Sequence, residues 1–371
     1  MTGTSAATPG DPGTAAEEDA FAAGGGWPAV LGRLVGGADL SGDEAALAMG
    51  EILSGAASAA QLAAFVTALR IKGETVEEMA GMVRAMLAHG EPLAVTGELV
   101  DTCGTGGDRS RSINVSTIAA FVTAGAGARV CKHGGRAASS SAGSADVLEA
   151  LGVAIDLGPA GVARCIEEVG MGFCFAPRFH PAMRHAIPVR RELGVPTVFN
   201  FLGPLANPAR PRHQVVGVSD PAMAEKMLGV LVANGARRAM VVHGDDGLDE
   251  LSTTGPSSVL EAVVTGEGPE IRRSTVDPGA LGIAPSRLED LRGGDAGENA
   301  GVVRRVLGGE RGPHRDIALL NAAAALVVCG TAADLPEGLE VAARSVDEGR
   351  AAGVLEGLVR ASKAAAVDLR P

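Results

Sequence analysis

The chain has 371 residues, of which 46% are hydrophobic and 2% aromatic, and its formal net charge is −12. This length predicts one large or two unequal domains, and the apolar content is sufficient for a sizeable core. The acidic balance argues against nucleic-acid and anionic-membrane partners, which require a basic face on the protein.

Residues 1–26 are the least patterned part of the chain. They are rich in Ala, Gly, Thr and Pro and include a few acidic residues, without the basic and apolar character of a signal peptide. This composition predicts a disordered N-terminal tail.

Residues 27–92 show the pattern of a small helical domain. Three capping boxes occur here, at Ser41-x-x-Glu44, Ser58-x-x-Gln61 and Thr75-x-x-Glu78. In a capping box the first side chain accepts from the backbone of the first helical turn, so each box marks a helix start. An apolar pattern at helical spacing follows each box, and together they predict about four short helices.

From 93 to 365 the pattern changes to short apolar runs that alternate with helical segments. This alternation predicts a larger α/β domain with a mostly parallel central sheet. Ligands of such sheets bind outside the carboxyl ends of the strands. Residues 177–211 are rich in proline and predict an irregular linking segment.

The segment Asp101-Thr-Cys-Gly-Thr-Gly-Gly-Asp108 follows a predicted strand and precedes a predicted helix that starts near Asn114. Its three glycines let successive N–H groups converge on an anion, and helix N-termini attract phosphate. Arg109 stands where a dinucleotide fingerprint needs glycine, and no Walker Gly-Lys-Ser/Thr is present. The segment therefore predicts a phosphate-binding loop of another kind.

A second segment, Lys132–Asp146, repeats this chemistry with two cations, paired glycines and four serine hydroxyls. Lysine and hydroxyl groups are common phosphate ligands. Two such loops suggest a ligand with phosphates at both ends.

The third motif is acidic, and it lies in Val241–Ser252, where Asp249 and Glu250 follow a predicted strand and turn. Adjacent carboxylates repel each other unless a cation binds between them, and magnesium is usually held by carboxylates together with substrate phosphates. The pair therefore predicts a magnesium site.

The five cysteines show no C-x-x-C spacing. We expect reduced thiols in a cytoplasmic protein, without a disulfide framework or zinc site. No apolar run approaches the roughly 20 residues of a membrane span, so no membrane partner is expected.

Taken in order, these motifs resemble the anthranilate phosphoribosyltransferases of tryptophan biosynthesis, and the likeness extends from about Trp27 to the last forty residues. The resemblance also rests on Phe175–Arg191 and Phe199–Pro208. It implies an architecture like that of nucleoside phosphorylases and phosphoribosyltransferases, a homodimer, and two Mg²⁺ ions. It further implies that part of 177–211 joins the helical domain.

The resemblance assigns site residues to this chain. Lys132 and His133 would be catalytic, Ser116, Asp249 and Glu250 would bind magnesium, and Gly104, Gly135 and Arg190 would bind anthranilate. The residues assigned to phosphoribosyl pyrophosphate are Gly104, Gly107, Asp108, Ser112, Asn114, Val115, Ser116, Thr117, Lys132, His133, Gly134, Gly135, Arg136, Ala137, Ala138, Ser139, Ser140 and Ser144.

The chain departs from the family at Gly135, where the usual Lys-His-Gly-Asn-Arg has asparagine. The change removes a side-chain donor between the two substrate sites. Two other functions stay open: a pyrimidine nucleoside phosphorylase, which would not need Asp249 and Glu250, and a non-catalytic relative that binds nucleic acid. Single-strand binding requires a positive groove with aromatic platforms, which this composition disfavours.

Overall fold

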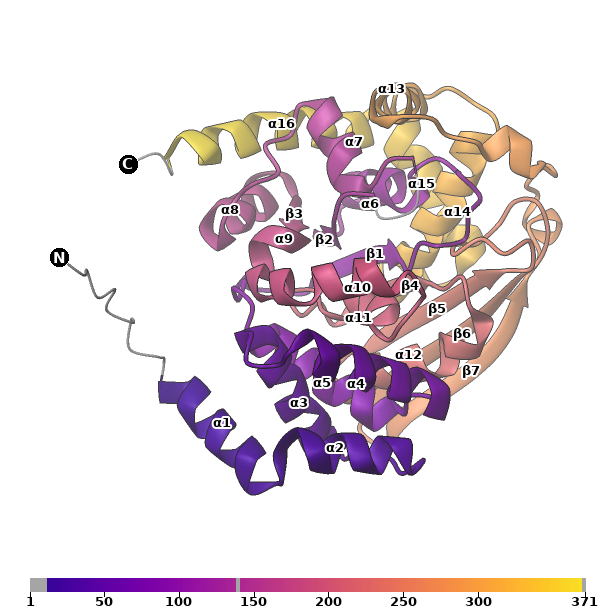
Figure 1. The fold of residues 1–371 in the computed structure, drawn as a ribbon. Helices are drawn as coiled ribbons and strands as arrows, with labels where there is room; N and C mark the ends of the chain where they lie inside the picture. The colour runs from indigo at the N-terminus through magenta and orange to yellow at the C-terminus, as the bar shows by residue number, and fades with distance from the viewer. Residues whose placement is uncertain (1–11, 138–140, 369–371) are drawn as a thin grey trace. The chain divides into compact units, whose positions relative to one another are not determined.

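The structure, a computed structural model, describes residues 12–137 and 141–368. The chain divides into two compact units, of which one comprises Met1–His89 and Ala182–Val198 and the other Gly90–Pro181 and Phe199–Pro371. The first unit is helical and the second has the α/β pattern (Figure 1). No helix within the described ranges is long and apolar enough to cross a membrane.

The helices of the helical unit begin where the capping boxes predict. In all three boxes both reciprocal hydrogen bonds are present, so the predicted helix starts are confirmed. The bounds are α1 (Pro12–Ala23), α2 (Gly26–Val35), α3 (Gly42–Ser54), α4 (Ala59–Lys72), α5 (Val76–Ala88) and α10 (Ile187–Leu193).

Part of the segment predicted to be disordered is helical. Helix α1 lies within residues 1–26, and its Phe21 ring is buried edge-on against Trp27 at 5.4 Å between ring centroids. Composition alone does not reveal this aromatic pair, which anchors the helix to the rest of the unit. Residues 1–11 lie outside the described part of the chain.

The predicted linking segment is more regular than its proline content suggests. It contains α9 (Ala176–Phe179), η1 (Pro181–His185), α10 and α11 (Phe199–Leu205). Proline stands in the first turn of α9 and α10, where its missing N–H costs nothing. Residues Ala182–Val198 of this segment belong to the helical unit, in which α10 packs on α4.

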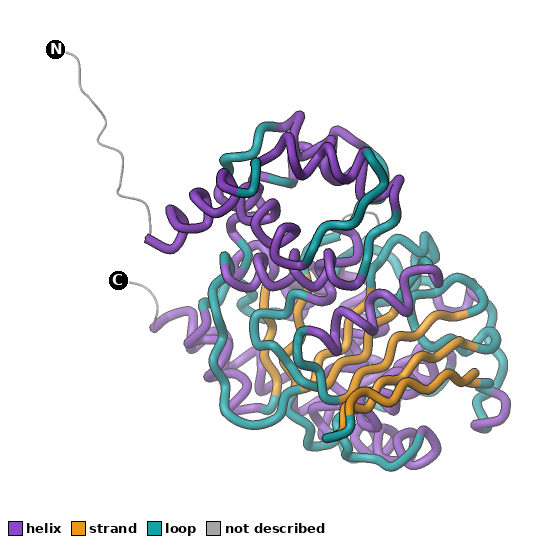
Figure 2. Tube along the Cα trace, turned by 90° about the horizontal axis from the view of Figure 1, so that it is seen from below, coloured by secondary structure: helices purple, strands orange, loops and turns teal. Residues whose placement is uncertain are grey.

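A seven-stranded sheet forms the centre of the α/β unit, with the order β3-β2-β1-β4-β5-β6-β7 (Figure 2). The first five strands in this order are parallel, and β6 and β7 add an antiparallel hairpin. This confirms the predicted fold class. The bounds are β1 (Val100–Gly104), β2 (Val130–Gly134), β3 (Met171–Phe175), β4 (His213–Gly217), β5 (Arg238–Gly244), β6 (Ser257–Thr265) and β7 (Gly268–Val276).

Helices cover both faces of the sheet. Helices α6 and α14 pack on each other and on β1, while α12 lies on the opposite side against β5 and β6 (Figure 1). The larger helices are α6 (Val115–Gly125), α7 (Ser144–Leu151), α8 (Pro159–Val169), α12 (Ala224–Ala233), α13 (Ala296–Leu307), α14 (Pro313–Val328), α15 (Leu335–Asp347) and α16 (Arg350–Asp368). Short 3₁₀ turns occur at η2 (Pro221–Met223), η3 (Gly279–Leu281) and η4 (Leu288–Leu291).

The direction of chain winding reverses between β1 and β4. From β1 the chain proceeds to β2 and β3 on one side, and it then returns to β4 and β5 on the other. In open parallel sheets the crevice at such a switch point is the usual ligand site. The loop after β1 therefore lies where a ligand is expected.

Helices α3 and α5 approach so closely that Gly81 has no space for a side chain. A Cβ at Gly81 would lie 1.9 Å from the Gly42 carbonyl oxygen, whereas one at the exposed Gly32 of α2 would meet nothing within 4 Å. We predict that Gly81→Ala lowers the free energy of unfolding by about 1–3 kcal/mol through overpacking. Gly32→Ala should raise it by roughly 0.5–1 kcal/mol.

Urea unfolding followed by the fluorescence of Trp27, the single tryptophan of the chain, measures both variants. A Gly81→Ala protein as stable as the wild type would contradict the close approach.

Candidate active site

The three predicted motifs follow strands of the α/β unit at the same edge of its sheet. The first loop follows β1, the second follows β2, and the acidic turn follows β5. Because these strands are parallel, their carboxyl ends coincide. The sheet thus brings together segments that are far apart in the sequence.

The first loop is built around the carboxylate of Asp249. The backbone N–H of Gly106 donates to Asp249 Oδ2 at 2.7 Å. A Cβ at Gly104 would lie 2.2 Å from the same oxygen, so glycine is required there for the carboxylate to approach. Gly106 and Gly107 have φ values of 65° and 81°, which glycine adopts readily.

Two arginines continue this loop in the left-handed conformation. Arg109 and Arg111 have φ values of 58° and 56°, and both are exposed. Such non-glycine residues cost on the order of 1 kcal/mol each and concentrate at ligand-binding segments. Between them, Ser110 Oγ donates to Asp108 Oδ2 at 2.7 Å.

The predicted site residues at the start of α6 differ in their exposure to solvent. Ser116 lies at the accessible end of the helix, whereas Val115 and Thr117 are buried. Within the described structure the Thr117 Oγ1 has no hydrogen-bond partner. Ser112 forms an antiparallel bridge with Arg292. Of the two predicted hydroxyls on α6 itself, that of the partly exposed Ser116 is therefore placed to meet a ligand, and that of the buried Thr117 is not.

Lys132 is a buried cation on β2. Its side chain is 1% exposed, and Nζ donates to Thr102 O at 2.7 Å and to Ser116 Oγ at 3.1 Å. The sequence predicted Lys132 and Ser116 as site residues from separate motifs, and the structure brings them into direct contact.

His133 follows on the same strand and is a neutral imidazole at physiological pH. Burial, followed by the nearby His180, lowers the pKa of His133 to about 3. The two rings lie edge-to-face at 5.3 Å between centroids. Among the described residues nothing hydrogen-bonds to the buried His133 Nε2.

The second loop lies between β2 and α7. Arg136 forms ion pairs with Asp146 and Glu149, at 2.8 and 2.9 Å, and the N–H of Ala137 donates to Asp146 Oδ2. Ser144 lies beside Gly134, where a Cβ would be 2.2 Å from its Oγ. The predicted residues Ala138, Ser139 and Ser140 lie outside the described residues.

The acidic turn places its two carboxylates in a poorly solvated position. Burial and then the negative charge of Asp108 raise the pKa of Asp249 to about 7. Burial and the adjacent Asp249 raise the pKa of Glu250 well above its usual value, while Lys132 lowers it. The backbone N–H of Ser116 also lowers the pKa of Glu250, to a smaller extent. The acidic turn thereby contacts the start of α6.

This donor set fits magnesium that is shared with a ligand. Asp249, Glu250 and the Ser116 hydroxyl supply hard oxygen atoms. Burial, and then repulsion between neighbouring carboxylates, raises the pKa values of Asp249 and Glu250, and a bound cation would offset both effects. No cluster of three or more His, Cys, Asp or Glu in the described ranges could hold a metal by itself. Magnesium commonly uses one or two carboxylates and completes its shell with phosphates and water.

Arg190 belongs to the helical unit, on α10, whereas the other predicted site residues of the described chain belong to the α/β unit. It is partly buried. Its predicted role toward anthranilate stays a prediction.

Several supporting residues were not predicted. Asp101, fully buried, accepts from Asn207 Nδ2 at 2.8 Å and from the His133 N–H at 3.3 Å. Burial raises the pKa of Asp101, and the charge of Lys132 opposes the rise. Asp101 stands inside the first motif, but its partner lies 106 residues away, so only the fold reveals the contact.

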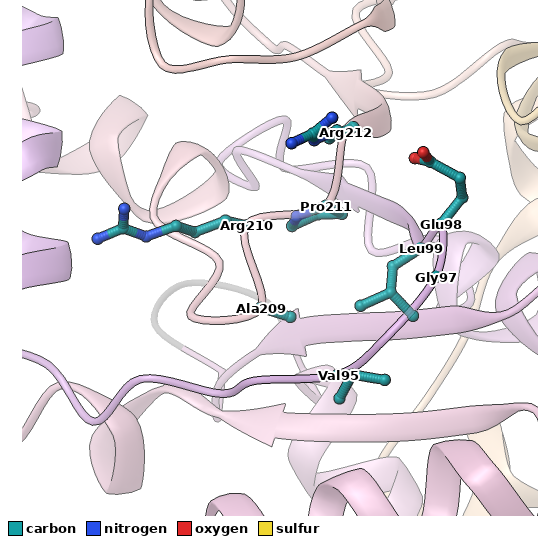
Figure 3. Close-up of a pocket in the computed structure, with 8 residues that line it drawn as sticks. All are labelled: Val95, Gly97, Glu98, Leu99, Ala209, Arg210, Pro211 and Arg212. Atoms are coloured by element: carbon teal, nitrogen blue, oxygen red, sulfur yellow. The ribbon is translucent and has the colours of Figure 1, made fainter.

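A cavity of about 350 Å³ lies elsewhere in the α/β unit (Figure 3). It is lined by Val95, Gly97, Glu98, Leu99, Ala209, Arg210, Pro211 and Arg212. These residues precede β1 and β4, so the cavity lies at the amino ends of the strands, at the edge opposite the predicted site. It contains no predicted catalytic residue, and we assign the chemistry to the carboxyl edge.

Comparison with known proteins agrees with this arrangement. Residues 96–352 match the model of the glycosyl transferase family a/b domain, and residues 28–90 match that of its helical bundle domain. Anthranilate phosphoribosyltransferase of Roseiflexus castenholzii is 56% identical over 331 residues, which span 89% of this chain and 96% of the relative. This chain belongs to the anthranilate phosphoribosyltransferase family.

Solved structures of the family have the same fold. The enzyme from Thermus thermophilus superposes with a TM-score of 0.84 at 43% identity, covering 90% of this chain and 99% of that one. The Saccharomyces cerevisiae enzyme in complex with phosphoribosyl pyrophosphate and Mg gives 0.82 at 26% identity, covering 91% and 98%. The resemblance drawn from the sequence motifs is therefore confirmed at the level of the family.

The buried neutral state of His133 predicts a pH dependence of stability. Its pKa is about 3 in the folded protein and about 6.5 when unfolded. Between these values the unfolded chain binds more protons, so stability falls as the pH falls from 6.5 toward 3, by about 1.4 kcal/mol per pH unit. His133→Gln should remove this contribution. Urea unfolding at several pH values from 4.5 to 7 measures it, and equal slopes for both proteins would contradict the burial.

Gly135 has room for the side chain that the family usually carries there. Its φ is outside the left-handed region, and among the described residues a Cβ would meet only Ala176 Cβ, at 3.9 Å. We predict that Gly135→Asn folds with unchanged stability and binds anthranilate as well or better, because a donor returns beside the predicted acceptor site. The measurement is kcat/KM for anthranilate. A large loss at unchanged stability would indicate a reshaped acceptor pocket.

Proposed function

We infer that this chain transfers the phosphoribosyl group of 5-phosphoribosyl 1-pyrophosphate to anthranilate, which gives N-(5-phosphoribosyl)anthranilate and diphosphate in tryptophan biosynthesis. The observation that carries this inference is the junction of three motifs at Ser116. Its Oγ accepts from Lys132 Nζ at 3.1 Å, and its backbone N–H, like Lys132, lowers the pKa of Glu250. A cation, a helix start and a metal-binding carboxylate thus meet at one point, as a diphosphate ligand requires.

Binding of the phosphate groups follows from the loop geometry. The glycine loop after β1 and the start of α6 lie at the carboxyl edge of the sheet, and backbone N–H groups at a helix start bind anions favourably. Magnesium, when bound, would neutralise the charge that develops on the leaving diphosphate. Asp249, Glu250 and the Ser116 hydroxyl would hold it, and we propose two ions.

The chain's own residues contribute positioning and electrostatics. Lys132 lies near Asp101 and Glu250, whose pKa values it lowers, and its ammonium group can stabilise the departing oxygen atoms. We propose that neutral His133 orients the amine of anthranilate or accepts its proton as the new bond forms. A pKa of about 3 makes His133 a weak base, which suits an acceptor that attacks uncharged. Arg190 is proposed to bind the anthranilate carboxylate through two parallel hydrogen bonds.

The test follows anthranilate fluorescence with phosphoribosyl pyrophosphate, with and without magnesium. We expect consumption that requires both. Phosphate-dependent cleavage of a pyrimidine nucleoside without magnesium would favour the phosphorylase, and retention on a nucleic-acid column would favour the binding protein. We also propose a homodimer in the cytoplasm, which sedimentation and cell fractionation would test.

Replacement of Glu250 separates metal binding from folding. Glu250→Gln preserves shape and removes one of two repelling charges, so we expect turnover to fall at least about a hundredfold. Because burial raises the pKa of Glu250, its ionised form destabilises the folded protein as the pH rises. Without magnesium at pH 8 the variant should therefore be as stable as the wild type or more stable.

Glu225→Gln serves as the control, since Glu225 is exposed and pairs with Arg273 on the surface. In Glu225→Gln, the turnover and the stability, measured as the melting temperature, should both stay near those of the wild type. High activity of Glu250→Gln at saturating magnesium would refute the metal assignment.

Arg190→Ala tests the anthranilate site. Loss of a desolvated guanidinium–carboxylate pair costs a few kcal/mol, so the anthranilate KM should rise on the order of a hundredfold. The KM for phosphoribosyl pyrophosphate should change little. The exposed neighbour Arg191, replaced by alanine, is the matched control. Equal changes in both KM values would mean that Arg190 is structural or contacts phosphate.

A further inference from the structure

A segment that none of the motifs included pairs with the first phosphate loop. The Gly293 N–H donates to Arg111 O at 2.8 Å, and the Ile113 N–H donates to Leu291 O at 3.0 Å. Between these bonds Ser112 and Arg292 form an antiparallel bridge. Residues 291–293 therefore hold the end of the loop through backbone hydrogen bonds.

The same segment leads into α13, whose buried Asn299 reaches the start of α6. Asn299 is 2% exposed, and its Nδ2 donates to Asn114 Oδ1 at 2.9 Å while its Oδ1 accepts from the Gly294 N–H at 2.8 Å. Asn114 Nδ2 in turn donates to Ala142 O at 3.0 Å, in the second loop. Two side-chain amides thus connect three segments.

The order of these bonds determines which way the Asn114 amide faces. An amide offers an acceptor at one end and donors at the other. Because Asn299 donates, the oxygen of Asn114 must face it, and the NH₂ group then faces the Ala142 carbonyl. With an acceptor at position 299, the Asn114 amide would turn over and present its oxygen to the Ala142 oxygen, which repels it.

The backbone around Asn299 leaves little room for a change in its position. A Cβ at Gly293 would lie 2.5 Å from Asn299 Oδ1, and one at Gly294 would lie 1.6 Å from Glu298 Oε2. Glycine at 293 is therefore required by the buried Asn299 side chain, whereas the exposed Glu298 side chain over Gly294 could shift.

We propose that Asn299 is a positioning residue for phosphoribosyl pyrophosphate. It fixes the Asn114 amide and thereby holds the first loop and the start of α6 in register with the second loop. It acts through Asn114 and touches no substrate. The inference rests on the proposed function, because it is the family resemblance that assigns Asn114 to the phosphoribosyl pyrophosphate site.

Asn299→Asp tests this, since it keeps an acceptor for Gly294 and the side-chain shape but loses the donor to Asn114. We expect the KM for phosphoribosyl pyrophosphate to rise about tenfold, the effect of one lost hydrogen bond. The values of kcat and the anthranilate KM should change less than about twofold.

Ser362→Ala is the control for lost stability alone. Ser362 is buried, and its Oγ accepts from the Ala154 N–H at 3.1 Å, away from the assigned site. This variant should melt earlier with unchanged KM values. If Asn299→Asp behaves in the same way, the inference is overturned.

A double-mutant cycle tests the route through Asn114. Asn114→Ala should raise the same KM, and adding Asn299→Asp should raise it no further. Additive increases would overturn the inference.

If the wild type does not consume anthranilate, the proposed function fails. In that case calorimetry measures the Kd for inorganic diphosphate with magnesium, in the wild type and in Asn299→Asp. A Kd about tenfold higher in the variant supports the inference, and an equal Kd overturns it.

Discussion

The site depends on one buried positive charge. Lys132 Nζ lies inside the α/β unit, held by the Thr102 carbonyl and the Ser116 hydroxyl. A buried cation is tolerable here because the carboxyl groups of Asp101 and Glu250 lie close to it, and its charge lowers the pKa of both. The same charge supports the ionised form of Glu250 and is placed to attract a diphosphate. Folding of the site and its chemistry therefore rest on the same interaction.

The carboxylates near this charge repel one another. Burial raises the pKa values of Asp249 and Glu250, and repulsion raises them further, from Asp108 on Asp249 and from Asp249 and Asp108 on Glu250. The protein accommodates this repulsion through the Gly106 N–H and through glycine at 104, which lets Asp249 approach. Such an arrangement is costly without a bound cation, and it is the arrangement that a phosphate-linked magnesium site requires.

Buried amides connect the pieces that bear the chemistry. Asn207 binds Asp101, Asn299 binds Asn114, and Asn321 binds both the N–H and the carbonyl of Leu251, next to Glu250. Each joins a helix or loop from the later half of the chain to a segment of the site. A buried amide with every hydrogen bond made holds its neighbours firmly, since breaking one bond leaves an unpaired polar group.

The sequence alone was sufficient for the helix starts at Ser41, Ser58 and Thr75, for the α/β class and for the family, because capping, apolar periodicity and glycine turns are local signals. It also identified Lys132, Ser116 and Glu250 as candidates. Only the tertiary structure brought Ser116 into contact with Lys132 and revealed the contacts of Asp101, Asn207 and Asn299. The helix that contains Phe21 was likewise missed. Each of these depends on a partner that the fold supplies, and composition or spacing along the chain carries no signal of such a contact.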